Sequence, residues 1–553
     1  MRNLRSAWQA LDKVERSLTV CITVLALFLV GTGMLLVRFL TAEQKEPVIQ
    51  SYNASNNGQP LATPEDFLPD NLRLGEKAVS AVFSKADGEA LSLDTLLQNT
   101  QYRNGVWILF WASWCPDCEE QLAYIDTMEA LSKQYGYELI LVDRLNPERE
   151  SVEKATEKLE QIHATAKCVF DRDGICYSSW GMHEIPSSVV LDRDGTVMDY
   201  ASGVITAGEC EGMLLRAENG RASGTMMFLE NNLLGNPGRV YTSFGNRTGE
   251  ASPSGKDILC ESQGLMLHYT LNCENRELFD RIWSDTQELL FIDGLPAWFA
   301  KENGQKADAS ALVDDMRIWS ALQEAGNRWG EPYAGQADML LQNIRQRELD
   351  RSGKLIDFFE FQTEKKASTI ALNYLDLSTI RNMAKREPAF EDAFQDAIEI
   401  LNNGLISEQF PLYYSSFDRR TGKYSKNDLN TVEALYTFWN LSRDGCLPEA
   451  SLQWLRQRVK NGDLAARYSV TGEPISGYEY HSTAVYSLAA LVAKEQKDPE
   501  LFELSVRRME RLYIADTESE VYGAYTQPGI ETFAFDQLLP LFVDSIIEQQ
   551  HSV

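Results

Sequence analysis

The sequence predicts a multidomain chain: a transmembrane helix, then an α/β domain, then an all-α domain. Three observations indicate this. An apolar run lies near the N-terminus, strand-like and helix-like segments alternate in the next part, and helical periodicity dominates the remainder. The 553 residues, 44% of them hydrophobic, suffice for two or more separate cores. We expect a cytoplasmic N-terminus at 1–17, the membrane helix at 18–40, a linker at 41–73, the α/β domain at 74–217 and the all-α domain at 222–553.

The formal charge of -29 excludes one class of function. Proteins that bind nucleic acids contact phosphates with concentrated Lys and Arg, and this chain has an excess of acids. Such acidity mainly gives solubility and says little about fold. We therefore expect no nucleic-acid partner.

The apolar run from Leu18 to Leu40 is interrupted only by Arg38, and as a helix it would be roughly 35 Å long, enough to cross a bilayer. Basic residues precede it, so the positive-inside bias puts the N-terminus in the cytoplasm: Arg2, Arg5, Lys13 and Arg16. The alternative is a cleaved signal peptide, but the run is too long and no small-x-small cleavage site follows it. The sequence predicts a single-pass protein of the cell membrane with its domains outside the cytoplasm.

The linker, residues 41–73, is rich in Asn, Gln, Pro and acidic residues without sustained periodicity. Such a composition is typical of a tether that holds a domain away from the membrane.

The α/β domain is predicted from an alternation of strands and helices. Residues 106–111 form a continuous apolar run typical of a buried parallel strand, and they lead into Cys115-Pro116-Asp117-Cys118. The other expected elements are a helix at 119–135, a strand at 139–142, a helix at 152–162, a strand at 169–170 and a strand segment at 184–195.

A strand, a Cys-x-x-Cys at a helix start and a later Ile185-Pro186 together resemble the thioredoxin superfamily, most closely the membrane-anchored TlpA-like thiol-disulfide reductases. The unpaired amides at the helix start would stabilise a thiolate at Cys115, and Cys118, one turn later, would resolve a mixed disulfide. The resemblance implies that Pro186 is cis, lies against the two cysteines and presents backbone to a substrate.

Two alternatives for the cysteine pair are a metal half-site and an inert disulfide. Zinc needs two more ligands, and no second Cys-x-x-Cys or nearby His pair follows. We expect no metal and no cofactor other than the redox-active Cys115-Cys118 pair, with an unidentified redox partner. The carboxylate of Asp117 should raise the pKa of the thiols and favour a reducing couple.

The remaining cysteines give less information. Cys168 and Cys176 flank a turn and could pair with each other, whereas Cys260 and Cys273 would be separated by roughly 20 Å of helix and could not.

Helical periodicity predicts about twelve helices in the all-α domain. The expected segments are 223–234, 261–272, 275–291, 311–326, 333–347, 376–386, 389–403, 428–443, 448–460, 481–495, 499–513 and 531–547.

One of these segments carries a candidate catalytic group. Glu261 stands where an apolar helix begins and is followed by Gln263 and Gly264, a glycine that allows close approach to the backbone. A partly desolvated carboxyl holds its proton near neutral pH and can act as a general acid. The alternative is a first-turn acid that complements the helix dipole.

A second helix, which begins near Val313-Asp314-Asp315-Met316, carries acidic residues at its start. Together the two segments resemble glycoside hydrolase family 8, the family of endoglucanases, chitosanases and xylanases. The resemblance implies an (α/α)6 barrel, with Glu261 as the proton donor and Asp315 as the acid that holds a hydroxyl of the distorted sugar. For Asp315 the alternative is first-turn electrostatics. The sequence departs from the family pattern at Val313, Thr431 and Leu265-Met266.

Inverting hydrolysis needs a second carboxylate, roughly 6.5–9.5 Å from the acid, to activate water. The resemblance assigns this base to Asp428, which follows an aromatic-rich loop. The alternative is that Asn427 or Asp428 caps the following helix.

Sugar rings stack on aromatic faces, so aromatic residues on or beside these blocks are candidate substrate contacts, with the helix core as the alternative place for each. The candidates, with the amide that follows the donor, are Gln263, Trp298, Trp319, Tyr374, Tyr413 and Tyr414.

The sequence thus predicts a membrane-anchored, outward-facing glycosidase that cuts internal β-1,4 links of a polysaccharide, joined to a thiol-disulfide oxidoreductase. One alternative makes thiol exchange the main activity and the helical domain a non-catalytic polysaccharide-binding module. Another makes the exterior a scaffold in which neither site is active.

Overall fold

The computed structural model of the chain describes residues 68–551 apart from 173, 246–252 and 528. The predicted membrane helix at 18–40 and nearly all of the linker lie outside the described residues. Within the described ranges, no helix combines the length and the hydropathy needed to cross a bilayer.

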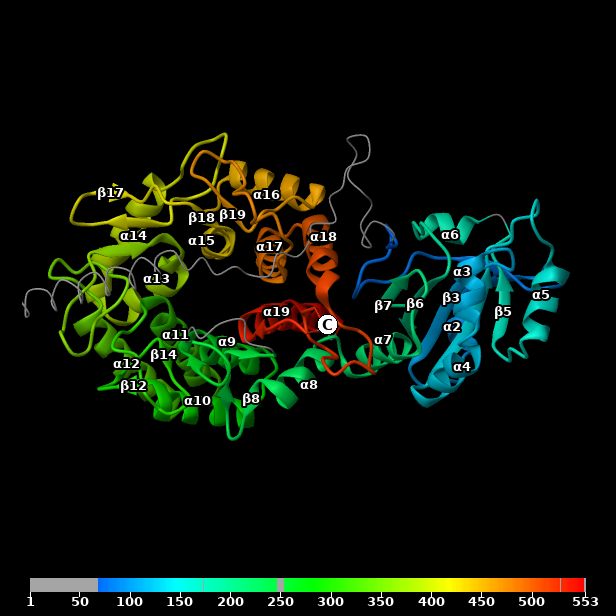
Figure 1. The fold of residues 1–553 in the computed structure, drawn as a ribbon, viewed down its shortest axis with the longest axis horizontal. Coiled ribbons are helices and arrows are strands. Elements are labelled where there is room, and N and C mark those ends of the chain that lie inside the picture. Colours follow the sequence, from blue (N-terminus) through cyan, green and yellow to red (C-terminus); the bar gives the residue numbers. More distant parts are fainter. Residues whose placement is uncertain (1–67, 173, 246–252, 528, 552–553) are drawn as a thin grey trace, which may run out of the picture. The chain divides into compact units, whose positions relative to one another are not determined.

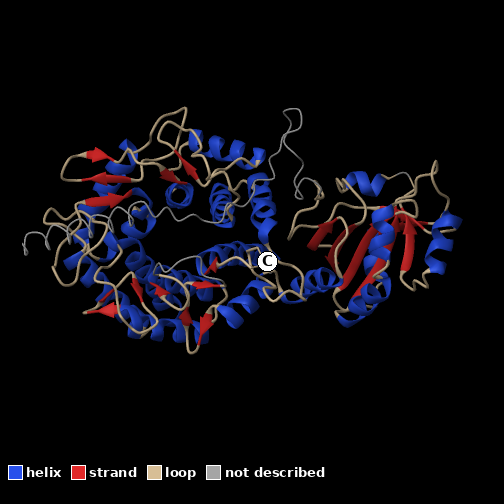
Figure 2. Cartoon of the chain, in the orientation of Figure 1, coloured by secondary structure: helices blue, strands red, loops and turns tan. Residues whose placement is uncertain are grey.

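The α/β domain is built on one seven-stranded sheet with the order β2-β1-β5-β4-β3-β6-β7 (Figures 1 and 2). Its central strand, β3 (Gly105–Trp111), is buried at every residue, as the continuous apolar run predicts. It pairs in parallel with β4 (Tyr137–Asp143) and antiparallel with β6 (Ser187–Asp192). The other strands are β1 (Val82–Ser84), β2 (Ala90–Ser92), β5 (Lys167–Phe170) and β7 (Val197–Ser202).

Gly105 begins the central strand at a position that only glycine fits. Its φ is +135°, and a Cβ there would lie 2.1 Å from the carbonyl oxygen of Leu191 in the neighbouring strand. The close pairing of β3 with β6 depends on this missing side chain.

The helices of this domain confirm the predicted alternation with one correction. The expected helix at 119–135 is two helices, α3 (Pro116–Leu122) and α4 (Ile125–Gln134), because the helix ends at Ala123 and Tyr124, with φ -95° and ψ 10°, leaves helical geometry. The other helices are α2 (Leu93–Asn99), α5 (Val152–Gln161), α6 (Ile175–Ser179) and α7 (Ala207–Asn219). A capping box between Thr206 and Glu209 starts α7.

Residues 222–551, as far as they are described, contain twelve helices of ten residues or more, and each predicted helical segment is confirmed. They are α8 (Ala222–Asn232), α9 (Cys260–Asn272), α10 (Arg276–Leu290), α11 (Leu312–Trp329), α12 (Tyr333–Arg347), α13 (Leu377–Arg386), α14 (Glu391–Asn403), α15 (Thr431–Arg443), α16 (Glu449–Asn461), α17 (Thr483–Gln496), α18 (Pro499–Met509) and α19 (Ala534–His551).

Alternate helices form an inner series. Helix α9 packs against both α11 and α19, α19 packs against α17, α17 against α15, and α15 against α13. The sequence of α17 suits this place: from Thr483 to Ala493 it carries no charge and every residue is buried, so the helix is covered on all sides. This order is the one expected for the inner ring of an (α/α)6 barrel.

Very short strands hold the starts of three inner helices. β11 (Ile258–Leu259) pairs with β14 (Phe299–Ala300) before α9, β18 (Leu429–Asn430) with β19 (Arg467–Tyr468) before α15, and β20 (Thr532–Phe533) with β10 (Ser243–Phe244) before α19. The remaining short elements are β8 (Leu234–Gly235), β9 (Arg239–Val240), β12 (Phe291–Ile292), β13 (Leu295–Pro296), β15 (Thr369–Ala371), β16 (Ser416–Asp418), β17 (Lys423–Tyr424), η2 (Leu372–Tyr374), η3 (Pro388–Phe390) and η4 (Glu510–Leu512).

Candidate active sites

Cys115 stands at the N-cap of α3, directly after the central strand. Its Sγ accepts the amide hydrogen of Cys118 at 3.4 Å and, as a thiol, donates to the carbonyl oxygen of Ile185 at 3.4 Å. Cys115 retains 8% of its exposure, while Cys118 is fully buried. The first cysteine can therefore meet another molecule, and the second can react only with the first.

Pro186 completes this centre. The Ile185–Pro186 peptide bond is cis, as the resemblance implies, and the proline is buried next to the carbonyl that Cys115 contacts. Burial raises the pKa of Cys118, and the neighbouring Cys115 and Asp117 raise it further. Cys118 is thus held as a thiol, and the predicted effect of Asp117 is present as the smallest contribution.

No sequence pattern singled out Glu150, yet this residue holds the loop before the cysteines. Its carboxylate accepts both the backbone N–H and the hydroxyl of Ser113. The guanidinium of the adjacent Arg149 lies 4.5 Å from the ring centre of Trp114. A loop from another βα connection therefore fixes the approach to Cys115.

The other described cysteines are free thiols in this structure. Cys168 and Cys176, which could have paired, do not. Cys260 and Cys273 lie at opposite ends of α9, as the helix spacing predicts.

The second centre lies where the inner helices α9, α11 and α19 begin. Glu261 is the second residue of α9, and 32% of its side chain remains exposed. Burial raises the pKa of Glu261 to about 7; Arg317 lowers it, and Asp314 and Asp536 raise it. Asp314 and Asp536 come from the first turns of α11 and α19, and Arg317 lies one turn further along α11, so three helix starts meet around one carboxyl.

Arg317 and Asp314 are an ion pair beside Glu261. Their side chains make an i, i+3 ion pair at 2.5 Å, and Arg317 Nη2 lies 4.0 Å from a carboxylate oxygen of Glu261. Both residues are mostly buried. This pair was not among the predicted site residues, although its i, i+3 spacing at a helix start is a recognisable pattern.

Asp315 does not occupy the place that the resemblance implies. It is fully buried and faces Glu348, whose carboxylate accepts the hydroxyl of Ser310 at 2.6 Å. Burial raises the pKa of Asp315, and the carboxyl of Glu348 raises it further. Asp315 is closed to a ligand by its burial, and the adjacent Asp314 is the acid of α11 that acts on Glu261.

The predictions that Gln263 and Trp319 contact the substrate are wrong, because both side chains are buried in the core. Gln263 is fully buried, and its amide accepts from Val240 N at 2.6 Å and donates to the hydroxyl of Thr286 at 2.9 Å. Trp319 is fully buried on α11. Gln263 ties α9 to its surroundings and Trp319 fills the core.

Asp428 lies on the surface, immediately before β18. The alternative role as a helix cap is wrong, because Asn430 is the N-cap of α15 and accepts the amide hydrogen of Val432. The assignment of Asp428 as the base stays a prediction.

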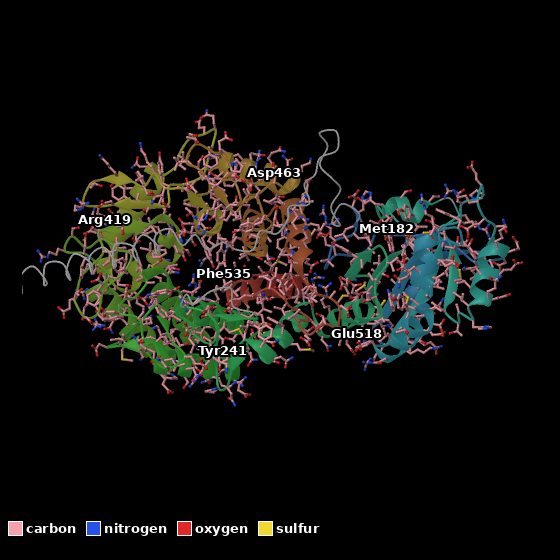
Figure 3. All side chains as sticks on the ribbon, viewed as in Figure 1. Met182, Tyr241, Arg419, Asp463, Glu518 and Phe535 are labelled. Carbon is pink, nitrogen blue, oxygen red and sulfur yellow. The ribbon has the colours of Figure 1, made fainter. Side chains whose placement is uncertain are left out.

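Aromatic residues flank the centre. Trp298 is half-buried, and its carbonyl accepts the amide hydrogen of Cys260 at 2.9 Å, next to Glu261. Tyr374 is also half-buried; burial raises the pKa of its hydroxyl, and the carboxyls of Asp314, Asp357, Glu261 and Glu433 raise it further. Phe535, labelled in Figure 3, lies with its ring centre 6.3 Å from that of Tyr436.

A small pocket adjoins Tyr374 through the preceding residue, Asn373. Tyr413 is largely buried and Tyr414 half-buried in its wall, and the ring of Tyr414 stacks on Tyr424 at 5.3 Å. The full lining is Asn373, Tyr413, Tyr414, Ser415, Leu429, Asn430, Glu433, Ala434 and Thr437. Two predicted aromatic contacts are thus brought together beside a carboxylate.

Comparison with protein families identifies both centres. Residues 74–212 match the Redoxin family, and residues 238–354 match glycosyl hydrolases family 8. The second match includes Glu261, Asp314 and Arg317.

Three relatives agree with this division. The chain is 29% identical over 324 residues to the putative lipoprotein YdaJ of Bacillus subtilis, covering 57% of this chain and 84% of YdaJ. It is 28% identical over 136 residues to the thiol-disulfide oxidoreductase ResA of Geobacillus thermodenitrificans, covering 24% of this chain and 72% of ResA. Among solved structures, an α-amylase from Clostridium perfringens aligns with a TM-score of 0.54 and 28% identity, covering 59% of this chain and 97% of that chain.

The two matched families correspond to the two centres described above, one at Cys115 and one at Glu261. The chain therefore joins a thioredoxin-like Redoxin domain at 74–212 to a glycosyl hydrolase family 8 domain at 238–354, which supports a glycosidase fused to a thiol-disulfide oxidoreductase.

Proposed function

We propose that the helical domain is an inverting endoglycosidase that cuts internal links of an extracellular polysaccharide, with Glu261 as its general acid and Asp428 as its base. The proposal rests mainly on one observation: the Glu261 carboxyl combines a pKa of about 7 with a side chain that is still 32% exposed. A carboxyl that is both protonated near neutral pH and open to solvent can give a proton to a leaving sugar oxygen.

The surroundings of Glu261 support a polymer as the substrate. Trp298 and Tyr374 are half-buried residues beside the centre, and the Tyr413/Tyr414 pocket adjoins Tyr374 through Asn373. Aromatic faces combined with a few polar groups are typical of sites that bind sugar rings. A chain of sugar units would contact these surfaces on both sides of the bond that is cut.

The base needs a separate test, because two exposed or half-exposed carboxylates lie near the helix starts. Asp428 directly precedes Leu429, which lines the pocket, and Asp536 lies in the first turn of α19. We assign the base to Asp428. Asp428→Asn should abolish hydrolysis, and added azide should restore cleavage of the glycosidic bond with an inverted glycosyl azide as the product, because azide attacks the anomeric carbon without needing a base. Asp536→Asn should leave substantial hydrolytic activity.

The type of glycosidic linkage that the enzyme cuts can be determined by assaying it on a panel of polysaccharides. The family resemblance favours a β-1,4-linked polymer, whereas the relative from Clostridium perfringens is an α-amylase. The soluble exterior should therefore be assayed for reducing-sugar release on β-glucan, chitosan and xylan, with starch and glycogen as the α-linked set. We expect cleavage within the β-linked set.

The decisive comparison uses two variants of the same chain. Glu261→Gln keeps the size of the side chain but cannot donate a proton, so the rate of sugar release should fall by on the order of 10²–10⁴. Cys115→Ser should leave sugar release unchanged. Equal activity of Glu261→Gln and the parent on the substrate that the screen identifies would overturn the assignment.

The thioredoxin-like domain favours a second activity. Its Cys115, Cys118 and cis-Pro186 arrangement is complete, so we propose that it exchanges thiols with a partner protein outside the cytoplasm. If the helical domain only bound polysaccharide, insulin reduction would persist while no glycan was cut.

We also propose that residues 18–40 anchor the protein in the cell membrane, with both domains outside the cytoplasm. After cell fractionation, the full chain should stay in the membrane pellet during an alkaline carbonate wash. Its release into the wash would contradict the anchor.

A further inference from the structure

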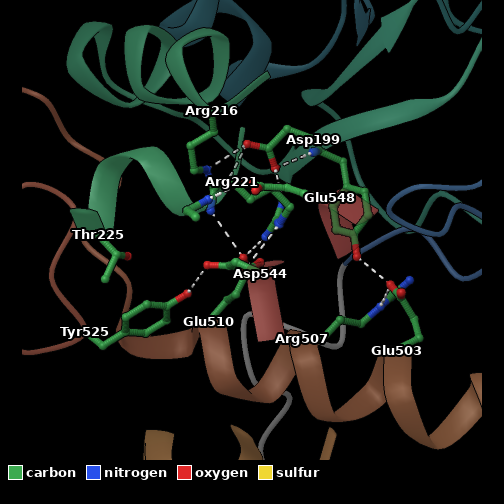
Figure 4. A network of polar contacts seen from close by, with 12 residues as sticks. Asp199, Arg216, Arg221, Thr225, Glu503, Arg507, Glu510, Tyr525, Asp544 and Glu548 are labelled. Atoms are coloured by element: carbon green, nitrogen blue, oxygen red, sulfur yellow. Dashed lines mark hydrogen bonds and ion pairs between the residues drawn. The ribbon is translucent and has the colours of Figure 1, made fainter. Parts of the chain in front are cut away.

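The thioredoxin-like domain and the helical domain share a buried network of charges (Figure 4). Arg216 of α7 lies 2.7 Å from Asp199 of β7 and 3.2 Å from Glu510 of η4. Arg221, directly before α8, contacts the same Glu510 and lies 3.5 Å from Asp544 of α19. The two arginines thus connect an acid of the sheet with two acids of the helical domain.

These charges are removed from water almost completely. The side chains of Arg216 and Arg221 are 7% and 3% exposed, and those of Asp199 and Asp544 are both 2% exposed. Burial raises the pKa of Asp544, and Arg221 and Arg216 oppose this rise. Removal of one arginine would leave a buried acid without its partner, which is far more costly than the loss of a surface ion pair.

A second set of contacts lies at the edge strand of the sheet. The Tyr200 hydroxyl donates to Glu503 of α18 at 2.7 Å, and Glu503 also accepts from Arg507 at 3.0 Å. Arg507 in turn donates to the carbonyl oxygens of Pro69 and, at 3.2 Å, of Leu72. Helix α18 is therefore bonded both to β7 and to the segment that leads into the sheet.

Glycines bring the backbones of the two domains into direct contact. A Cβ at Gly212 of α7 would lie 2.0 Å from the carbonyl oxygen of Ala515, and one at Gly208 of the same helix would collide with the side chain of Asp516. The backbone N–H of Thr517 donates to the carbonyl oxygen of Gly208 at 3.2 Å. Such close packing is typical of a permanent interface.

We infer that the thioredoxin-like domain is a structural part of the glycosidase, which it supports by holding α19. The same helix presents Asp544 to Arg221 and, in its first turn, Asp536 to Glu261. The two domains therefore unfold as one cooperative unit, and Arg221 is a positioning residue for α19, which it contacts at Asp544.

Calorimetry of the full chain tests this inference without any substrate. The parent should unfold in a single transition. Arg221→Met keeps the aliphatic stem but removes the charge, so it should lower the Tm by roughly 5 °C or more and separate the transition into two. Arg420→Met is the matched control, because Arg420 is 74% exposed and pairs only at the surface with Asp418; its Tm should change by less than about 1 °C.

A pair of glycine variants gives an independent measurement if Arg221→Met fails to fold. Gly212→Ala must push α7 away from Ala515, whereas Gly335→Ala on α12 would meet only the flexible side chain of Glu331, 3.1 Å away. Gly212→Ala should speed hydrogen exchange in α19 while exchange in β3 stays slow. Gly335→Ala should change neither.

Two results would overturn the inference. One is a parent chain that unfolds in two resolved transitions. The other is an Arg221→Met or Gly212→Ala variant whose Tm and α19 exchange match those of its control. Both readouts are independent of glycan cleavage, so a failure here is distinct from a failure of the proposed activity.

Discussion

The two active sites use the same structural position, the N-terminus of a helix, in different ways. At α3, Cys115 is the N-cap, and its sulfur accepts the amide hydrogen of Cys118. At α9, the N-cap is Leu259, which makes no side-chain cap bond, and Glu261 follows among other acids. A helix N-terminus favours negative charge. Even so, burial, Asp314 and Asp536 together raise the pKa of Glu261 to about 7.

The comparison shows that a helix terminus does not by itself determine a protonation state. Loss of solvent and nearby charges of like sign outweigh the dipole at α9, so a carboxyl keeps its proton where a dipole alone would remove it. At α3 the fully buried group is Cys118, one turn into the helix, whereas the reactive Cys115 stays partly exposed.

The largest expected effect is the complete loss of one activity, with the other unchanged, when one site is mutated. Cys115→Ser removes the only partly exposed sulfur of the pair, so insulin reduction should fall to the background rate while sugar release is unchanged. Glu261→Gln should give the reverse pattern. Loss of both activities in either variant would show that the two sites do not act separately.

The next largest effect tests how a neighbouring charge sets the pKa of Glu261 at the start of α9. Glu261 must be protonated to act, so activity should decline as the pH rises through its pKa of about 7. Arg317 lowers that pKa, so Arg317→Gln should move the decline upward by up to about one pH unit.

The matched control for Arg317→Gln is Arg328→Gln on the same helix, since Arg328 pairs at the surface with Glu324. The pH–rate profile of each variant gives the answer. A downward shift in Arg317→Gln would contradict the electrostatic explanation.

A smaller shift in the opposite direction is expected for Asp536→Asn. The Asp536 carboxylate raises the pKa of Glu261 less than burial does, so its removal should lower the pH of the decline by a few tenths of a unit. If Asp536 instead served as the base, the rate itself would collapse at every pH.

The smallest effect concerns stability. The pKa of Glu261 rises from 4.5 to about 7 on folding, so the folded state binds more protons in this window and loses stability as the pH rises from about 4.5 to about 7. Glu261→Gln removes this loss. The variant should be about 1–2 kcal/mol more stable than the parent at pH 8 and equally stable at pH 4. Urea unfolding at the two pH values measures the difference, and equal stability at both would show that Glu261 is not strained by its site.

Much of the fold could be predicted from local pattern. The apolar run at 106–111 and the twelve periodic segments became β3 and helices α8 to α19, because burial on one face or all faces leaves a period in the sequence. The break between α3 and α4 could not be predicted, since neither Ala123 nor Tyr124 is a helix breaker.

The candidate site was predicted less completely. Glu261 and the Cys115-Cys118 pair are where the motifs placed them. Neighbouring residues on one helix point in different directions, however, so a motif that spans Asp314 and Asp315 cannot say which carboxyl meets Glu261. Gln263 and Trp319 were misassigned for the same reason.

The sequence by itself determined the division into a thioredoxin-like and a helical domain, the redox pair and the acid at the start of α9. These depend on composition, spacing and period, which are local properties of the chain. Only the tertiary structure decided which acids surround Glu261, which aromatic rings are open to a ligand, and that Arg216 and Arg221 join the two domains. Those contacts link residues far apart in the chain, and their energies depend on burial, which no local pattern records.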